Sequence, residues 1–184
     1  MLATEPVLRL TRSARTVVRV AAQDGNGWVD CRCGGRHWGR NGAAGLVLVA
    51  RADVDGDQPL LLLQLRAAWT HEGGTWGVPG GARDSHESVE AAAVREAGEE
   101  AGIRAHEVAL AGRHPGADHG DWSYTYVLAT AVPPGTGRPE HRVVTDESDH
   151  VAWVRLDEVG ALPLHPGLAR DWPALAVRLS DLVR

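Results

Sequence analysis

The sequence predicts an α/β protein in which strands pack around two helices, an arrangement that suits an α/β/α sandwich. Apolar runs of strand length occur at 46–50 and 60–65, and a β-rich, alternating run occurs over 122–132. Helical patterns cover a segment that ends near Gly102 and the range 167–183. At 184 residues the chain suits one domain, or one domain with an extension.

The N-terminal part, residues 1–40, is expected to be an extension of the main domain. Within it, 16–22 (TVVRVAA) has the composition of a short strand. The glycine-rich run 27–42 (GWVDCRCGGRHWGRNG) predicts irregular structure that carries cysteine and histidine. The strands at 46–50 (LVLVA) and 60–65 (LLLLQL) follow, separated by a polar turn.

The part of the chain after the first helix adds further strands. Strands are expected at 108–113, at 122–132 (WSYTYVLATAV) and at 151–156 (VAWVRL). A long polar loop is expected over 133–147, and a helical turn begins in 157–162.

Composition excludes some classes of partner. The net charge is −5, which argues against non-specific binding to nucleic acid. No apolar run reaches the roughly 18 residues that a membrane span needs. The N-terminus lacks the apolar core of a signal peptide, so we expect a cytoplasmic protein with no membrane partner. A homodimer is the base-rate expectation, since two-fold pairs are the commonest assembly.

The acidic residues of the first helix predict a metal site. Glu96, Glu99 and Glu100 stand at i, i+3 and i+4, which places them on one helical face. Like charges at this spacing repel each other and cost stability, so they need a compensating cation. A hard divalent ion such as Mg²⁺ prefers carboxylate oxygen and often also holds a phosphate.

The sequence also predicts where this helix begins and ends. Ser88 can accept a hydrogen bond from an otherwise unpaired backbone N–H as the N-cap. Glu90 in the first turn suits the helix dipole. Gly102 can take the left-handed conformation that closes a helix. The preceding run 76–81 (WGVPGG) is a turn that lets backbone carbonyls come close to a ligand.

The same stretch carries a family motif, G-x₅-E-x₇-R-E-x₂-E-E-x-G. Its fixed positions are Gly81, Glu87, Arg95, Glu96, Glu99, Glu100 and Gly102, and the apolar Ile103 follows. In these residues the chain resembles the Nudix family and has a complete Nudix box; Ala97 stands where the family usually has a larger aliphatic residue. The resemblance implies a Nudix-like α/β/α sandwich with a mixed sheet over residues 41–160. The helix within 161–184 is then expected to pack on that core.

The resemblance implies hydrolysis of a nucleoside diphosphate linked to another group, with a small nucleotide as substrate. Glu96, Glu99 and Glu100 match the family's metal-binding positions, with the carbonyl of Gly80 as a further candidate ligand. The implied cofactor is Mg²⁺, with Mn²⁺ as a second possibility. Arg95 and Glu87 match a pair that braces the loop against the helix, and a bidentate contact would suit that role.

The general base is open between a box glutamate and a carboxylate on a later loop. The run TDESDH supplies Asp146, Glu147 and Asp149 just before a predicted strand. We choose Glu147 as an extra metal ligand or base. The alternative is an ordinary charged turn.

Substrate contacts are predicted for four residues. Arg66 follows a strand and is a candidate for a phosphate contact, with a solvated arginine as the alternative. Trp122 and Tyr124 alternate with Tyr126 on one strand and share a face, so one of them could stack on a nucleobase. Core packing is the alternative for these rings. Trp76, in the turn before the box, is a further candidate.

Several substrate classes stay open. A nucleoside triphosphate is the first choice, and ADP-ribose or a nucleotide sugar is the second. A Nudix-like module that binds a nucleotide without hydrolysing it is a different class of function, as is an isomerase acting on an isoprenoid diphosphate. The complete box favours hydrolysis over the binding module. The isomerase would need Cys31 or Cys33 as its acid, and nothing in the sequence places either thiol over the metal site.

Cys31, Cys33 and His37 form part of a possible zinc site, because thiolate and imidazole are suitable Zn²⁺ ligands. A structural site needs four ligands, and C-x-C is closer than the usual spacing. His71 or another histidine would have to complete it. The alternative is two free cysteines on a surface loop.

Overall fold

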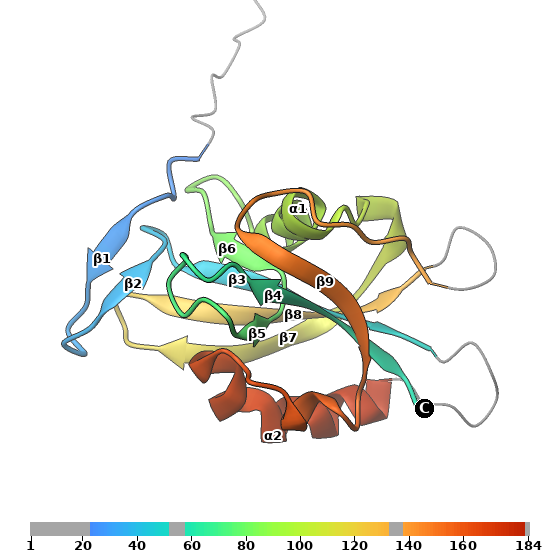
Figure 1. The fold of residues 1–184 in the computed structure, drawn as a ribbon. Helices are drawn as coiled ribbons and strands as arrows, with labels where there is room; N and C mark the ends of the chain where they lie inside the picture. Colours follow the sequence, from blue (N-terminus) through green and yellow to red (C-terminus); the bar gives the residue numbers. More distant parts are fainter. Residues whose placement is uncertain (1–22, 52–57, 133–137, 183–184) are drawn as a thin grey trace, which may run out of the picture.

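The computed structural model describes residues 23–51, 58–132 and 138–182, and these residues form one mixed sheet with a helix on each face, next to a separate hairpin (Figure 1). The sheet strands are β3 (Ala43–Ala50), β4 (Leu60–Arg66), β5 (Trp76–Gly77), β6 (Gly80–Ala82), β7 (Val108–Asp118), β8 (Ser123–Ala131) and β9 (Ser148–Arg155). The helices are α1 (Val89–Ala101) and α2 (Pro166–Leu182), with short 3₁₀ helices at Ala105–Glu107 and Val159–Ala161. The α/β/α sandwich with a mixed sheet is therefore confirmed.

The sheet divides at β3. Its main path runs β5-β4-β3-β8-β7, with β9 paired to β4 and β6 paired to β3. The β3–β8 pair is parallel and the other pairs are antiparallel. Strand β4 pairs with β3 only near Val49 and Ala50, whereas β6 pairs with the opposite end, at Ala43 to Gly45. The chain between β5 and α1 is thereby held against the start of β3.

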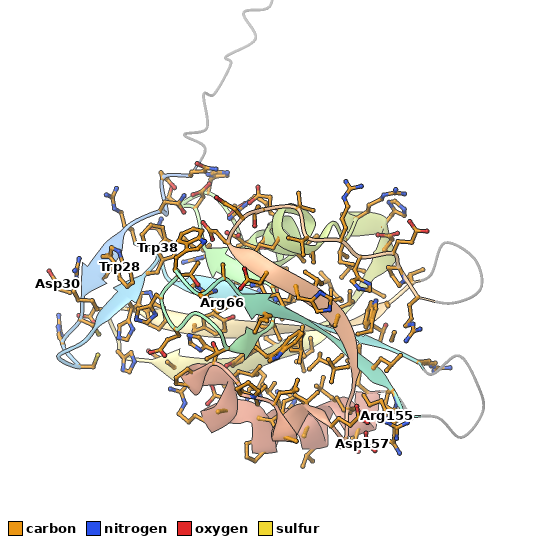
Figure 2. All side chains as sticks on the ribbon, viewed as in Figure 1. Trp28, Asp30, Trp38, Arg66, Arg155 and Asp157 are labelled. Atoms are coloured by element: carbon orange, nitrogen blue, oxygen red, sulfur yellow. The ribbon has the colours of Figure 1, made fainter. Side chains whose placement is uncertain are left out.

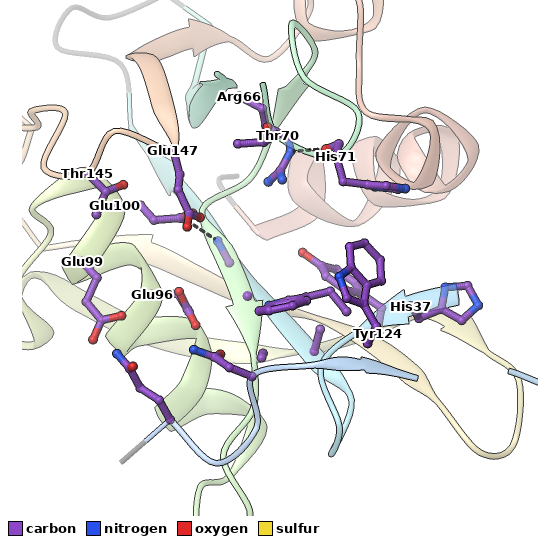
Figure 3. A pocket seen from close by; sticks show the side chains of 18 of the residues that line it. His37, Arg66, Thr70, His71, Glu96, Glu99, Glu100, Tyr124, Thr145 and Glu147 are labelled. Carbon is purple, nitrogen blue, oxygen red and sulfur yellow. Dashed lines mark hydrogen bonds between the residues drawn. The ribbon is translucent and has the colours of Figure 1, made fainter. Parts of the chain in front are cut away.

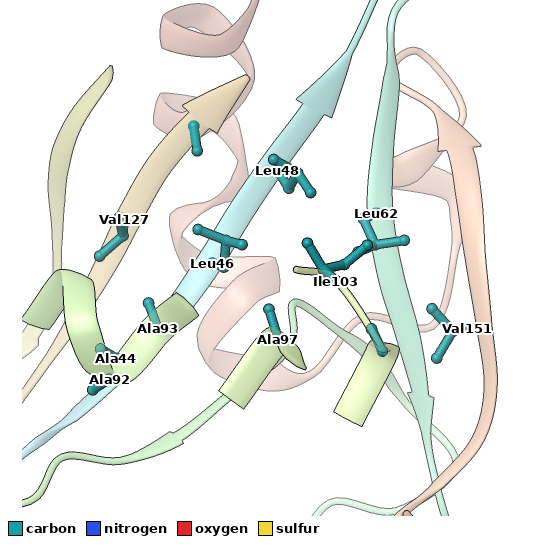
Figure 4. Packing of buried hydrophobic residues seen from close by; sticks show 12 residues of the cluster. Ala44, Leu46, Leu48, Leu62, Ala92, Ala93, Ala97, Ile103, Val127 and Val151 are labelled. Atoms are coloured by element: carbon teal, nitrogen blue, oxygen red, sulfur yellow. The ribbon is translucent and has the colours of Figure 1, made fainter. Parts of the chain in front are cut away.

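Alternation along β3 divides the core between the two helices. Leu46 and Leu48 face α1, whereas Val47 and Val49 face the side covered by α2. The α1 side is built from small residues, and Ala93 and Ala97 are fully buried against Leu46 and Leu62 in Figure 4. Small side chains allow the helix backbone to approach the sheet closely. The α2 side is filled by Leu168, Leu175 and Leu179.

Helix α1 begins and ends as the sequence predicts. The hydroxyl of Ser88 accepts a bond from the N–H of Ala91 at 3.1 Å. Gly102 has φ +74°, and its N–H donates to the carbonyl of Gly98 at 3.2 Å. These caps set the register of the helix, and so decide which residues face the sheet.

The segment 27–42 corrects an expectation. It was predicted to be irregular, but it contains a hairpin of β1 (Trp28–Asp30) and β2 (Arg36–Trp38). Trp28 and Trp38 are directly opposite each other, and their rings meet edge to face at 5.5 Å. Gly34 and Gly35 lie in the turn between the two strands, which pair from Trp28 opposite Trp38 to Asp30 opposite Arg36.

The other expected elements are present with shifted ends. Strand β7 extends through Pro115, which an edge strand tolerates because the missing N–H interrupts no central ladder. The predicted strand 16–22 lies outside the described residues, as does the start of the loop expected over 133–147. No helix among the described residues is both long and apolar enough to cross a membrane.

Candidate active site

A cavity of about 610 Å³ opens where β6 pairs with the start of β3. Carboxylates from α1 line one side, and Tyr124 and His37 lie across from them in Figure 3. Its volume is in the usual range for small-ligand sites, about 300–1,000 Å³. The cavity therefore joins an acidic wall to an aromatic wall.

Glu100 is the most firmly held of the acidic residues. Its Oε2 accepts hydrogen bonds from the Gln64 side-chain amide at 3.0 Å and from the Gly80 N–H at 2.7 Å. Gln64 is itself fixed, because its Oε1 accepts from the Ser148 hydroxyl at 2.6 Å. All three side chains are buried. This chain of bonds leaves Glu100 Oε1 with no donor among the described residues, on a side chain that lines the cavity.

Burial makes this wall attractive to a cation. It is the largest cause that raises the pKa of Glu100, to about 8, and the neighbouring charge of Glu96 contributes to the same rise. Burial also raises the pKa of Glu96, with Arg95 acting in the opposite direction and Glu99 and Glu147 adding to the rise. A divalent cation would relieve both the desolvation and the repulsion.

Arg95 ties the box together. Its Nε and Nη2 donate to the two oxygens of Glu87 at 2.8 and 3.0 Å, in a fork-like contact. Its Nη1 donates to Glu96 at 2.8 Å and to Glu99 at 3.1 Å. The guanidinium also reaches the carbonyl of Ala82, and its hydrogen bonds hold the pKa of Glu87 below its ordinary value. These hydrogen bonds thus fix helix α1 against the turn that precedes it.

Two glycines allow this close approach. A Cβ on Gly81 would lie 2.6 to 2.9 Å from the carboxylate of Glu96. A Cβ on Gly80 would lie 2.5 Å from the backbone of Ala44 and Gly45. A side chain at Gly80 would push the turn away from β3, whereas a side chain at Gly81 would displace the Glu96 carboxylate.

The acidic wall fits a hard divalent ion in its chemistry. Its donors are carboxylate oxygens, which suit Mg²⁺ and Mn²⁺. Thr145 adds a buried hydroxyl that has no hydrogen-bond partner among the described residues and lines the same cavity. The three box glutamates do not place one oxygen each within 4.8 Å of one another. The reason is that Arg95 draws Glu96 and Glu99 toward itself, while Glu100 is held by Gln64 and Gly80.

Glu147 lies at this wall as well. Its side chain points toward Glu100 in Figure 3, and its charge contributes to the raised pKa of Glu96. Its backbone carbonyl accepts from the N–H of Ala67 at 2.9 Å, which holds the residue beside the end of β4. Asp146 and Asp149 are not among the cavity-lining residues. The structure therefore brings Glu147, of the three candidates, to the box.

The predicted substrate-binding residues divide into two groups. Arg66, Trp122 and Tyr124 line the cavity. The Nε of Arg66 donates to the carbonyl of His71 at 3.1 Å, so its guanidinium is anchored at the cavity wall. Trp76 is not brought to this wall: it packs against the α2 side of the core and contacts the ring of His150.

Comparison with known proteins agrees with this geometry. The NUDIX domain family model matches residues 40–176 of the chain. The chain belongs to the Nudix hydrolase family. A Nudix hydrolase of M. smegmatis, RenU, has 42% identity and a TM-score of 0.76, over 87% of this chain and 98% of that one.

Two curated Nudix relatives match at similar identity. The "Putative 8-oxo-dGTP diphosphatase 3" of Mycobacterium tuberculosis is 47% identical over 83% of this chain and 69% of that protein. The "Nucleoside triphosphate pyrophosphatase/Nudix hydrolase fusion protein" of Bifidobacterium longum is 44% identical over 87% of this chain. The match spans only 33% of the fusion protein. Nudix proteins generally use divalent metal ions, which agrees with the acidic wall.

Several residues that build this Nudix site were missed by sequence analysis. Trp28 and Trp38 of the hairpin line the cavity, and Figure 2 shows both near the end of the molecule that carries Arg66. His165, just before α2, also lines it. The sequence signal for the hairpin is a pair of tryptophans, Trp28 and Trp38, placed on either side of a glycine-containing turn. The position of His165 had none, because it depends on where the chain after β9 returns to the sheet.

The raised pKa of Glu100 predicts a pH dependence for this Nudix protein when metal is removed. The folded protein keeps a proton with a pKa of about 8, whereas the unfolded chain releases it near 4.5. Raising the pH through this interval therefore favours the unfolded state, by on the order of a few kcal/mol. Urea unfolding of chelator-treated protein across the interval measures the slope. A Glu100→Gln variant should show a shallower slope, and an equal slope in both proteins would contradict the prediction.

Proposed function

We propose that this Nudix protein is a Mg²⁺-dependent hydrolase that cleaves a phosphoric anhydride bond in a nucleoside triphosphate. One observation carries the proposal: a single cavity holds buried carboxylates on one wall and several tryptophans on the other. A nucleotide has the same division, with an anionic phosphate chain and a flat base. A cytoplasmic location suits such a substrate, and the homodimer stays a prediction.

The acidic wall would hold the metal ion. Glu96, Glu99 and Glu100 supply carboxylate oxygens, and the carbonyl of Gly80 and the hydroxyl of Thr145 are further candidate ligands. When bound, the ion neutralises the phosphate oxygens and lowers the pKa of a coordinated water. Gln64 and Gly80 orient Glu100 through two hydrogen bonds, so that its second oxygen faces the cavity.

Glu147 is proposed as the general base. It lies beside the acidic wall, on the segment that leads into β9, and can take a proton from the water that attacks phosphorus. The water oxygen forms the new bond to phosphorus, the bond from that phosphorus to the bridging oxygen breaks, and the leaving product keeps the bridging oxygen and the bond's electron pair. Arg95 positions Glu87, Glu96 and Glu99 for this step through its hydrogen bonds.

The phosphate chain of the substrate would lie toward the acidic wall of the cavity, and its base would lie toward the aromatic wall. Arg66 and His165 line the cavity between the two walls, and Arg66 provides a positive charge for a phosphate. Burial lowers the pKa of His165, and its Nδ1 accepts from the N–H of Gly167 at 3.1 Å. The imidazole is therefore neutral at pH 7, with Nε2 as its donor. Trp28, Trp38 and Trp122 offer flat surfaces on which a base can stack, at about 1–3 kcal/mol per contact.

The choice of a triphosphate rests on the named relatives. The M. tuberculosis relative is named for a deoxynucleoside triphosphate with an oxidised base, at 47% identity. The runner-up is ADP-ribose or a nucleotide sugar, which would use the same acidic wall. A module that binds a nucleotide without cleaving it is the third class.

Product analysis across a substrate panel tests the proposal. Purified full-length protein with Mg²⁺ is given nucleoside triphosphates with normal and oxidised bases, ADP-ribose and nucleotide sugars. We expect release of a nucleoside monophosphate and pyrophosphate from a triphosphate, and loss of that turnover in Glu99→Gln. Glu90→Gln is the matched control, because Glu90 lies on the same helix and pairs with Arg113 outside the cavity.

Each other outcome decides against part of the proposal. Faster cleavage of ADP-ribose or a nucleotide sugar would move the substrate to the runner-up. Tight binding with no product anywhere in the panel would favour the binding module. Equal activity in Glu99→Gln and Glu90→Gln would remove the metal role of Glu99.

A further inference from the structure

The tip of the β1–β2 hairpin gathers three metal-ligating side chains outside the acidic wall. Cys31 and Cys33 lie in the turn, and His37 is on β2. The turn is held by the Cys31 N–H, which donates to the carbonyl of Gly35 at 2.9 Å, and by the Gly34 N–H, which donates to the Cys31 carbonyl. Gly34 has φ +84°, so the tight turn that brings both thiols to one side depends on glycine.

The three ligand atoms already lie close together. Both sulfur atoms and one nitrogen of His37 are within 4.8 Å of one another, and Cys33 Sγ is 3.1 Å from His37 Nε2. Ligand atoms on a tetrahedral zinc ion stand roughly 3.5–3.8 Å apart, as follows from bond lengths near 2.3 Å to sulfur and 2.1 Å to nitrogen. Small side-chain rotations would therefore supply three of the four corners of a tetrahedron.

A fourth ligand is available from the neighbouring turn between β7 and β8. Asp121 Oδ1 is 3.2 Å from Cys31 Sγ, and its other oxygen accepts from the N–H of Arg32 at 3.3 Å. Asp121 is not yet within 4.8 Å of the whole group. Because its Oδ1 already contacts Cys31 Sγ, the proposal needs only a rotation of the Asp121 carboxylate toward Cys33 and His37.

The surroundings favour a metal over free thiols. Cys31 is buried with its sulfur against the Asp121 carboxylate, whereas Cys33 is exposed with its sulfur beside the His37 ring. A thiol and a carboxylate in contact gain most from a cation that both can bind. His37 stacks on Trp122 at 4.3 Å and on His119 at 4.8 Å, which fixes its ring beside the two cysteines.

We propose that Cys31, Cys33 and His37, with Asp121 as fourth ligand, bind one structural zinc ion that fastens the hairpin to the β7–β8 turn. The site is separate from the acidic wall in its chemistry, since thiolate and imidazole select zinc over Mg²⁺. Trp122, directly after Asp121, lines the cavity, and its indole N–H donates to the carbonyl of Trp38 at 3.0 Å. Zinc would therefore hold two walls of the cavity together: the hairpin with Trp28 and Trp38, and the turn with Trp122.

Metal analysis of untagged full-length protein, purified without chelator, tests the site directly. We expect one zinc ion per chain in the wild type and none in Cys33→Ser, in which the altered side chain is exposed and its loss does not disturb the core. Cobalt substitution should give a thiolate-to-metal charge-transfer band in the wild type that is absent from Cys33→Ser. His37→Gln should also lose zinc, whereas His106→Gln, an exposed histidine far along the chain, should keep it.

The zinc measurement is independent of the proposed hydrolase function. Glu100→Gln should keep zinc, since it alters only the acidic wall. Zinc that is lost in Glu100→Gln and kept in Cys33→Ser would overturn the proposal, as would wild-type protein with no zinc and no cobalt–thiolate band. A second readout rests on the proposed function: removal of zinc should raise the KM for the nucleotide several-fold with kcat little changed. A fall in kcat alone would contradict the proposal that zinc holds the hairpin against the β7–β8 turn.

Discussion

Glu100→Gln is expected to leave the protein folded and to lower turnover by roughly 10²–10³-fold, the usual cost of removing one preorganised charge from a catalytic site. The substitution keeps the size of the side chain and an oxygen that can accept from Gln64 and Gly80. It removes the negative charge that the proposed metal requires. Because burial opposes that charge, metal-free Glu100→Gln should be at least as stable as the wild type near pH 8.

A buried glutamate elsewhere is the control for this loss. Glu107 is also buried, but it lies in the 3₁₀ helix after α1, where it accepts from the N–H of Arg104 at 2.7 Å. Glu107→Gln should keep turnover close to that of the wild type. Turnover under saturating Mg²⁺ and urea unfolding measure the two effects separately. Near-normal turnover in Glu100→Gln would contradict the metal assignment.

Arg95→Met is expected to destabilise the protein by about 3–5 kcal/mol and to abolish turnover. The substitution leaves Glu87 and Glu96 without their cation, and their side chains are only 11% and 14% exposed. A carboxylate that is mostly buried and loses its partner pays its desolvation cost in full. Urea unfolding with and without Mg²⁺ measures the change.

A surface arginine supplies the matched control. Arg113 pairs with Glu90, but its side chain is 58% exposed, so Arg113→Met should cost only about 0–1 kcal/mol. Arg95→Lys keeps the charge but loses the fork-like contact, and should fall between the two. Equal, small costs for Arg95→Met and Arg113→Met would show that the box network does not hold the turn against α1.

Much of the acidic wall could be predicted because its residues are close in sequence. The carboxylates of Glu96, Glu99 and Glu100 share a helical face by spacing alone, and Ser88 and Gly102 mark the ends of that helix. The contact between Arg95 and Glu87 spans a single turn and the helix after it. Strands with a clear period were likewise found with small errors at their ends.

Trp122 and Tyr124 were candidates for the opposite wall, but the contacts that complete the cavity could not be predicted, because they join segments far apart in the chain. Trp122 meets Trp38 on the opposite wall, and Ser148 supports Gln64, which bonds Glu100 on the acidic wall; each of the two contacts spans 84 positions. Trp76 shows the converse. It stands next to the box in sequence, yet the pairing of β5 with β4 directs it to the α2 side of the core.

Residue spacing within one turn and one helix was thus enough to identify the family and to locate its carboxylates, since helical geometry follows from local backbone bonding. Which tryptophans face those carboxylates, how Glu100 is supported, and which thiols meet Asp121 depended on how the hairpin and sheet strands pack. Packing brings together residues that no local period relates, and the cavity exists only once that packing is complete.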